Sequence, residues 1–149
     1  MQRLQLEKLL EVFRRGAAVA FVAYLIVFAI IGGYLVFLKG YDLRTFLNEA
    51  TAQAAITAMT IWIIVFFGTY AVKEFFKYIS GKEDVYIEGT NAILRIIVGI
   101  IMVGLVVFLI MFIQTVDLSN IIDIMLSLPM MLGLLVMLRE SYNVYKAIK

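Results

Sequence analysis

Four long apolar stretches dominate the pattern of hydrophobic and polar positions along this 149-residue chain. They cover about residues 16–38, 50–72, 92–113 and 121–138, and shorter, more polar segments separate them. Each stretch approaches the roughly 20 residues that a helix needs to cross a hydrocarbon core about 30 Å thick. A helix satisfies its own backbone polar groups inside a bilayer, and the sequence lacks the alternation of membrane barrel strands. The pattern therefore predicts an all-α fold, a polytopic transmembrane bundle of four helices.

Composition supports a membrane location. Hydrophobic residues make up 64% of the chain and its mean hydropathy is +1.00, whereas roughly half of a soluble domain is apolar. A soluble fold of this size could not bury so much apolar surface, and a bilayer removes that requirement. We expect a multi-pass protein of the cell membrane, with residues 1–149 forming one transmembrane domain in contact with the lipid bilayer. The first stretch is too long for a signal-peptide core, so we expect it to be retained.

The basic residues predict the orientation of the helices. Of the 13 Lys and Arg residues, only Lys39 and Arg44 lie in the two loops on one side of the predicted bundle. The others lie in the amino-terminal segment, around the middle loop, and in the tail of residues 139–149. Because cytoplasmic loops are enriched in Lys and Arg, we expect both termini to be cytoplasmic.

Helical periodicity extends beyond the spans on this cytoplasmic side. Residues 1–15 include LQLEKLLEVFRR, which places leucines on one face and charges on the other, and so predict an amphipathic cytoplasmic segment. This segment either lies on the inner membrane surface or anchors the first span, and we favour the anchor. The second helix should end at Ser80-Gly81. Thr90 or Asn91 should cap the third helix.

The two turns on the opposite side resemble each other. FLKGYDLRTFLN and FIQTVDLSNIID share a Phe, an Asp-Leu pair five residues later, and the apolar positions that follow. Asp42 and Asp117 would each cap a descending helix, because a carboxylate there accepts free amide hydrogens. Either a two-helix hairpin was duplicated, giving two repeated helical hairpins, or two tight turns converged on one capping solution. We favour convergence, because almost no identities recur at this offset outside the window.

Asp123 stands out in DIMLSLPMML, near the start of the fourth span. An ionisable residue within a span is a candidate functional site. An acid at a helix start is also favourable in itself, and Asn120 with Asp123 imitates a capping box, so we favour a structural role. Arg44 of the first hairpin is the candidate ion-pair partner. An unpaired Asp123 could instead take up a proton or bind a cation.

Pro129 is the candidate helix kink of the fourth span. Its ring clashes with the carbonyl of Met125 and removes one backbone hydrogen bond. Ser127 could donate a hydrogen bond to the freed carbonyl. Such kinks are tolerated in membrane helices, so Pro129 alone does not indicate a gate.

The second span carries an uncharged polar face beside a face of small residues. The polar face consists of Gln53, Thr57 and Thr60, and the small face of Ala50, Ala54 and Ala58. Further close helix contacts are expected at Ala29 with Gly33, and at Gly99 and Gly104. The polar face could line a water-filled path or pack against another helix, and we favour packing because membrane helix interfaces are commonly built this way.

The residue types give little support for catalytic or cofactor chemistry. The chain has no Cys and no His, which removes thiolate nucleophiles, imidazole haem ligands and most zinc and copper sites. No phosphate-binding glycine loop or nucleophile–base set is recognisable. We therefore expect no catalytic residue, no cofactor, no metal site and no enzyme activity. A net charge of +2 is too small to indicate a nucleic acid partner.

The four-span layout resembles that of the small phosphate-starvation-inducible membrane proteins, most nearly around EFFKYISGKEDVYIEG. That stretch covers the end of the second helix and the loop after it. No residue role is carried across from the family.

Two functional hypotheses follow. The leading one is a structural or accessory subunit of a membrane assembly, acting through helix–helix contacts with itself, as a homo-oligomer, or with other integral membrane subunits. Spans with so little charge offer little to a translocated solute, whereas small-residue faces suit association. The alternative is a homo-oligomeric ion or small-solute channel or transporter, with a path near Gln53, Thr57, Thr60, Asp123 and Ser127.

Overall fold

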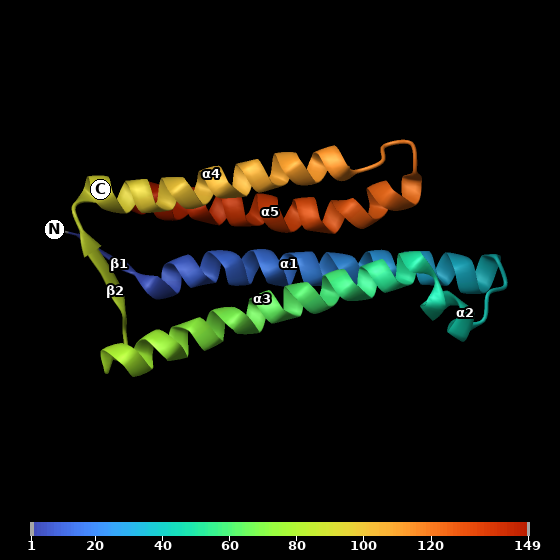
Figure 1. Ribbon diagram of the computed structural model, residues 1–149, viewed down its shortest axis with the longest axis horizontal. Helices are drawn as coiled ribbons and strands as arrows, with labels where there is room; N and C mark the ends of the chain where they lie inside the picture. Colours follow the sequence, from blue (N-terminus) through green and yellow to red (C-terminus); the bar gives the residue numbers. More distant parts are fainter. Residues whose placement is uncertain (1, 149) are drawn as a thin grey trace.

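Four long helices account for most of the chain in the computed structural model, which describes residues 2–148 (Figure 1). They are α1 (Leu6–Gly33), α3 (Ala50–Ser80), α4 (Asn91–Thr115) and α5 (Ile121–Ala147). Each is long and apolar enough to cross a membrane, as the sequence predicted. The protein is therefore an all-helical chain with the character of a multi-pass membrane protein.

The helices form two neighbouring hairpins. Helix α1 packs along both α3 and α5, and α4 packs along α5 (Figure 1). The shared core contains Tyr24 of α1, Trp62 of α3, Leu105 of α4 and Leu134 of α5. Large apolar side chains remain exposed on the outer surfaces of the helices, as expected for surfaces that face lipid. Both chain ends lie at one end of the bundle, here called the terminal end, and the opposite end is called the turn end.

The closest helix contact lies between α1 and α5. A Cβ atom added to Gly133 would meet the Cβ of Ala20 at 2.7 Å and the carbonyl oxygen of Gly16 at 3.0 Å. A Cβ added to Gly16 would overlap the side chain of Met137. Small residues thus let the two backbones approach, as is typical of membrane helix pairs. The sequence predicted this type of contact, but not at Gly16, Ala20 and Gly133.

The glycines singled out from the sequence do not make these contacts. Nothing lies within 4 Å of a Cβ added to Gly33, Gly99 or Gly104. Gly33 on α1 and Gly99 and Gly104 on α4 fit the small-residue pattern, but they lie on faces without a close helix contact in this chain. In α3, the buried alanines are Ala52 and Ala55, on a different face from the predicted one.

A two-stranded antiparallel sheet closes the terminal end, and sequence analysis did not predict it. Strand β1 (Gln2–Gln5) pairs with β2 (Tyr86–Gly89), and Arg3 lies opposite Glu88. Leu4 is buried in an apolar cluster with residues of α1 and α4. Helix α1 then runs without interruption from Leu6, so the amphipathic stretch is the start of α1 and not a separate helix.

The loop between the hairpins is bounded as predicted. Helix α3 ends at Ser80, and Gly81 follows with φ of +67°, a left-handed conformation that glycine adopts without steric cost. The hydroxyl of Thr90 accepts a hydrogen bond from the Ile93 amide and caps α4. The capping residues confirm both predicted boundaries.

The first turn at the turn end contains two short helical elements. Helix α1 continues into the π-helix η1 (Tyr34–Leu38), and Gly40, with φ of +75°, ends it. Helix α2 (Leu43–Asn48) follows, and the Asp42 carboxylate caps it by accepting the Thr45 amide at 2.7 Å. Asp42 is therefore a cap, as predicted, but of this short helix and not of the second span.

The second turn is shorter, and its predicted cap was wrong. Helix α5 begins at Ile121, and Asn120 caps it by accepting the Ile122 amide at 3.0 Å. Asp117 lies too early in the loop to cap α5, and accepts hydrogen bonds from the amide and hydroxyl of Ser119 instead. The two turns are thus built differently, and the duplication of a hairpin stays a prediction.

Candidate functional site

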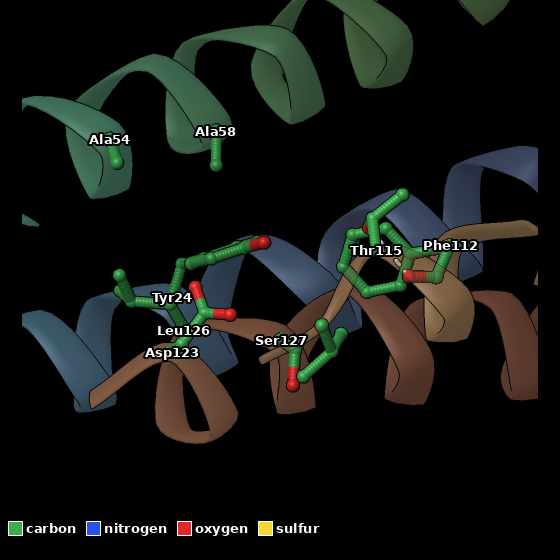
Figure 2. A pocket seen from close by; sticks show the side chains of 9 residues that line it. Tyr24, Ala54, Ala58, Phe112, Thr115, Asp123, Leu126 and Ser127 are labelled. Carbon is green, nitrogen blue, oxygen red and sulfur yellow. Dashed lines mark hydrogen bonds between the residues drawn. The ribbon is translucent and has the colours of Figure 1, made fainter. Parts of the chain in front are cut away.

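A cavity of about 180 Å³ lies between the two hairpins, nearer the turn end (Figure 2). All four long helices contribute to its walls. The lining residues are Tyr24, Ala54, Ala58, Phe112, Thr115, Val116, Asp123, Leu126 and Ser127. Four of these residues, Tyr24, Thr115, Asp123 and Ser127, bring polar side chains to a cavity whose other lining residues are apolar.

Asp123 supplies the only formal charge among the lining residues of this cavity. It lies in the first turn of α5, where its Oδ2 atom accepts the backbone amide of Asp117 at 2.7 Å. This hydrogen bond folds the second turn back onto the helix start. Within residues 2–148, Asp123 forms no ion pair with Arg44, because the carboxylate instead closes its own turn. The structural role that we favoured is therefore a local one and does not connect the hairpins.

Tyr24 and Thr115 are polar lining residues that were not predicted from the sequence, and Tyr24 is the more buried of the two. It comes from α1, its side chain is only 4% exposed, and it lines the cavity with Asp123. Its hydroxyl makes no hydrogen bond to another residue in the described part of the chain. The available signal was a tyrosine in the middle of the first span, far from the membrane boundaries where such residues usually lie.

Two further hydroxyl groups line the cavity, and each is held by its own helix. Ser127 donates to the carbonyl of Ile124 at 2.7 Å, and Thr115 donates to the carbonyl of Phe112 at 2.7 Å. Both oxygens thereby keep lone pairs for a ligand, because a hydroxyl that donates one hydrogen bond can still accept. The predicted bond from Ser127 to the carbonyl freed by proline is absent; Ser127 bonds to Ile124 instead.

Small residues on α3 leave room for the cavity. Ala54 and Ala58 face Asp123 and Tyr24 across the space (Figure 2). Pro129 is fully buried in α5, two residues after the lining residue Ser127, and the helix continues through it from Ile121 to Ala147. Its predicted kink stays a prediction.

The other predicted path residues do not line this cavity. Gln53, Thr57 and Thr60 are exposed on the outer surface of α3. Gln53 donates to the carbonyl of Leu47 at 2.6 Å, and Thr60 donates to that of Ile56 at 2.9 Å. The structure therefore divides the predicted set into Asp123 and Ser127, which line the cavity between the hairpins, and an exposed polar face on α3.

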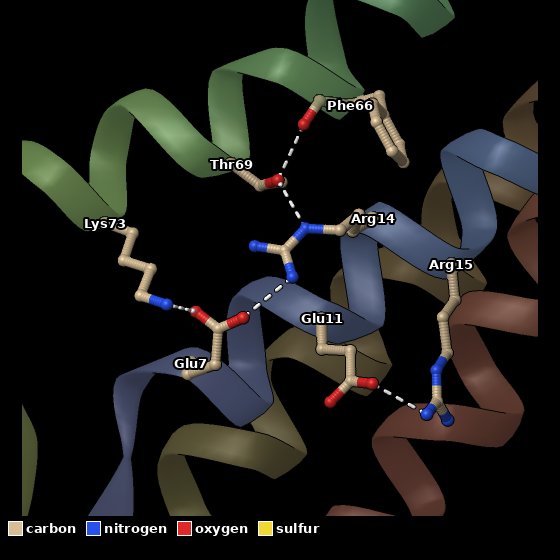
Figure 3. Close-up of polar contacts among 7 residues, drawn as sticks. All are labelled: Glu7, Glu11, Arg14, Arg15, Phe66, Thr69 and Lys73. Carbon is tan, nitrogen blue, oxygen red and sulfur yellow. Dashed lines mark hydrogen bonds and ion pairs between the residues drawn. The ribbon is translucent and has the colours of Figure 1, made fainter. Parts of the chain in front are cut away.

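A second polar cluster lies at the terminal end, between α1 and α3 (Figure 3). The Arg14 guanidinium donates to the Thr69 hydroxyl at 3.1 Å and to the Glu7 carboxylate at 2.7 Å. Lys73 lies 3.3 Å from the other Glu7 oxygen, and the guanidinium stacks 3.9 Å from the ring centre of Tyr70. Opposite charges meet at short range within it, so this cluster connects helices and is not an open binding site.

The next residue of α1 makes the corresponding connection to α5. Arg15 lies 2.7 Å from Glu140 of α5 and 2.6 Å from Glu11 of its own helix. Arg95 of α4 donates to the carbonyl of Ile148 at 2.9 Å, just beyond the end of α5. From the sequence, Arg14, Arg15 and Arg95 predicted only the orientation of the helices in the membrane. In the structure they also connect helices to one another.

The described residues hold no group of three or more acidic, His or Cys side chains that could bind a metal ion. In comparisons with known proteins, no family model, no curated protein and no solved structure matches the chain. The resemblance to the phosphate-starvation-inducible proteins gains no support from them. Functional inference therefore rests on the cavity, the outward face of α3 and the apolar helices.

Proposed function

We propose that this small membrane protein acts through helix–helix contacts, as a structural or accessory subunit of a membrane assembly and not as an enzyme. The observation that carries the proposal is the outward position of Gln53, Thr57 and Thr60 on α3. These side chains interrupt a surface that is otherwise formed by large apolar residues such as Ile61 and Ile64.

A lipid environment makes this face a plausible contact surface. Thr57 lies seven residues into α3, about 10 Å along a helix that rises 1.5 Å per residue, within the depth of the span. Hydrocarbon offers a polar side chain no hydrogen-bond partner, whereas another helix can. Gln53 uses one of its amide hydrogens within its own turn, and its remaining donor and acceptor capacity is available to a partner.

The charge distribution supports an orientation with both termini in the cytoplasm. The chain ends and the basic cluster of Arg14, Arg15 and Lys73 lie toward the same end of the bundle. Lys39 and Arg44 lie at the turn end. Because the positive-inside rule is read from short loops and helix flanks, the terminal end belongs on the cytoplasmic side.

Disulfide cross-linking through single cysteines tests the proposed contact, since the native chain has no cysteine. We expect Thr57→Cys to cross-link to another subunit in native membranes. Val107→Cys is the matched control, because Val107 is exposed on α4 at a similar distance from the turn end and lies on an apolar surface. Equal cross-linking at both positions, or at neither, would contradict a specific contact through α3.

Native mass spectrometry from mild detergent then identifies the assembly. We expect a defined complex, with copies of this chain or with other membrane subunits. The combined change Gln53→Leu, Thr57→Val and Thr60→Val should weaken it roughly twentyfold, since each of the three polar contacts between membrane helices contributes about 0.6 kcal/mol. A monomer in both detergent and nanodiscs would rule out the subunit role.

The second candidate is a homo-oligomeric channel or transporter, and the cavity around Asp123 and Ser127 favours it. The cavity supplies a polar site inside the span region but no path, and the outward residues of α3 could extend it only between copies. Flux of ions into liposomes that Asp123→Asn abolishes would support this function. A defined complex without flux would favour the accessory subunit.

A further inference from the structure

We infer that the cavity between the hairpins binds a single monovalent cation, with the Asp123 carboxylate and the Tyr24 hydroxyl as its main ligands. The site goes beyond the accessory role proposed above and does not depend on it. It would supply the binding step that the transporter candidate requires, and it would equally serve as a structural ion site.

The Tyr24 hydroxyl is the observation that points to a ligand. Its side chain is 96% shielded from the surroundings, yet its oxygen has no protein partner in residues 2–148. The hydroxyl oxygen itself is not among the fully buried polar atoms that lack a partner, so it is open to the cavity and free to bind a ligand there. The cavity lies against this hydroxyl, so a bound ion or its water would provide the missing interaction.

Asp123 has one oxygen in use and one available. Its Oδ2 atom accepts the Asp117 amide, which orients the carboxylate and leaves Oδ1 without a protein hydrogen bond among the described residues. Figure 2 shows the carboxylate and Tyr24 on the side of the cavity that faces the α3 alanines. The hydroxyl oxygens of Thr115 and Ser127 each retain acceptor capacity at the same cavity.

The charge of the site selects a monovalent ion. The lining residues include one carboxylate and no Lys or Arg, so a single positive charge neutralises them. A divalent ion would leave a positive charge in apolar surroundings, where uncompensated charge is costly. Its usual sites also supply several carboxylates, which this one lacks.

The donor atoms select the kind of ion. All of the available ligands are oxygens, which suit hard cations such as Na⁺ or K⁺, and no imidazole or thiolate is present to favour a transition metal. The volume of about 180 Å³ exceeds that of a bare ion, so the ion would keep several waters as additional ligands.

Thermal unfolding of the purified full-length protein in detergent tests the inference. NaCl and KCl are titrated separately at constant ionic strength against choline chloride, whose methylated ammonium cannot be coordinated directly by oxygen ligands as Na⁺ or K⁺ can. We expect a saturable rise in Tm with Na⁺ or K⁺ and none with choline. Isothermal titration calorimetry of the same sample should give one ion per chain.

Three variants locate the ion. Tyr24→Phe removes only the hydroxyl and should weaken the ion response at least tenfold, and Asp123→Asn should abolish it. Asp42→Asn is the matched control, because Asp42 is an acid at the same end of the bundle outside the cavity, and its response should equal that of the native protein.

Several results would overturn the site. These are a Tm independent of Na⁺ and K⁺, an equal response to choline, tighter binding of Ca²⁺ than of either ion, or an unchanged response in Tyr24→Phe. Because Tyr24→Phe keeps the ring packed in the core, it remains informative even if Asp123→Asn fails to fold. The cross-linking at Thr57 is measured independently, so failure of the ion site leaves the subunit proposal intact.

Discussion

At the terminal end, side chains of α1 bind both neighbouring helices, whereas at the turn end the side-chain hydrogen bonds of the described residues join positions close in sequence. Arg14 reaches Thr69 of α3 and Arg15 reaches Glu140 of α5. At the turn end, by contrast, Asp123 binds the amide of Asp117, six residues away in the chain. Contact between the hairpins there is apolar, through residues clustered around Phe46.

The cavity that contains Asp123 lies toward the turn end, where the side-chain hydrogen bonds of the described residues are local. Close contact of the α1 and α5 backbones at Gly16 and Gly133, together with the ion pairs, fixes the helices in the terminal half. Toward the turn end, the hydroxyls of Thr115 and Ser127 donate to carbonyls of their own helices, and a cavity of about 180 Å³ lies between the hairpins. Because these hydrogen bonds stay within single helices and turns, they do not draw the two hairpins together across the cavity.

The largest expected effect comes from filling the backbone contact of the terminal half. Gly133→Ala places a methyl group 2.7 Å from the Cβ of Ala20, which forces α1 and α5 apart. We expect a loss of about 1–3 kcal/mol of unfolding free energy, the usual range for overpacking. Unfolding by SDS in mixed micelles measures it.

The control for this variant is Gly104→Ala on α4. A Cβ added there meets nothing within 4 Å, so stability should stay equal or rise slightly, because alanine favours helix more than glycine does. Equal losses in the two variants would show that the glycine effect is not specific to the α1–α5 contact.

A smaller effect is expected from breaking the connection between α1 and α3. Arg14→Leu removes the hydrogen bond to Thr69 and leaves Glu7 with Lys73 as its remaining partner. Because Arg14 is largely buried, with 13% side-chain exposure, we expect a loss of about 1–2 kcal/mol, near the range for charged hydrogen bonds. The same micelle unfolding assay applies.

Arg3→Gln provides the comparison for Arg14. It removes an ion pair with Glu88 whose side chains are both more than half exposed, and exposed pairs contribute about 0–1 kcal/mol. A greater loss for Arg3→Gln than for Arg14→Leu would contradict the central role of the buried cluster. Arg14→Lys should recover little, because an ammonium lacks the planar fork that reaches both partners.

The four spans and several helix ends could be predicted because their causes are local. Apolar length defines the spans, a glycine with positive φ ends α3, and the Thr90 hydroxyl caps α4. Asp117 was the exception, since any of several polar residues in its loop could have served as the cap. Asn120 lies immediately before α5 and takes that role.

The features that could not be predicted depend on residues far apart in the sequence. Strand β1 forms only because residues 86–89 pair with it, and its own sequence continues the helical pattern of the residues after it. The α1–α5 contact depends on the register of two helices, which decides which small residues meet. The cavity likewise depends on long-range packing, which brings Tyr24 of α1 and Asp123 of α5 to the same cavity.

The smallest effect concerns the local cap at the turn end. Hydrogen bonds from Thr45 hold the pKa of the exposed Asp42 carboxyl below its ordinary value. The folded state therefore favours the charged form, and its contribution to helix α2 is fully present above the ordinary pKa of about 3.9. It is lost as the pH falls through the lowered pKa of the folded protein.

Amide hydrogen exchange at Thr45 detects this loss without requiring global unfolding. Relative to Asp42→Asn at each pH, the native amide should be better protected at neutral pH and should lose that advantage in acid. The Asn side chain keeps an acceptor oxygen but cannot titrate, so it isolates the effect of charge. If the ratio of Thr45 amide protection in the native protein to that in Asp42→Asn stays constant with pH, the cap acts through its hydrogen-bond geometry and not through its charge. In that case charge would stabilise the helix contacts at the terminal end but not the cap of α2 at the turn end.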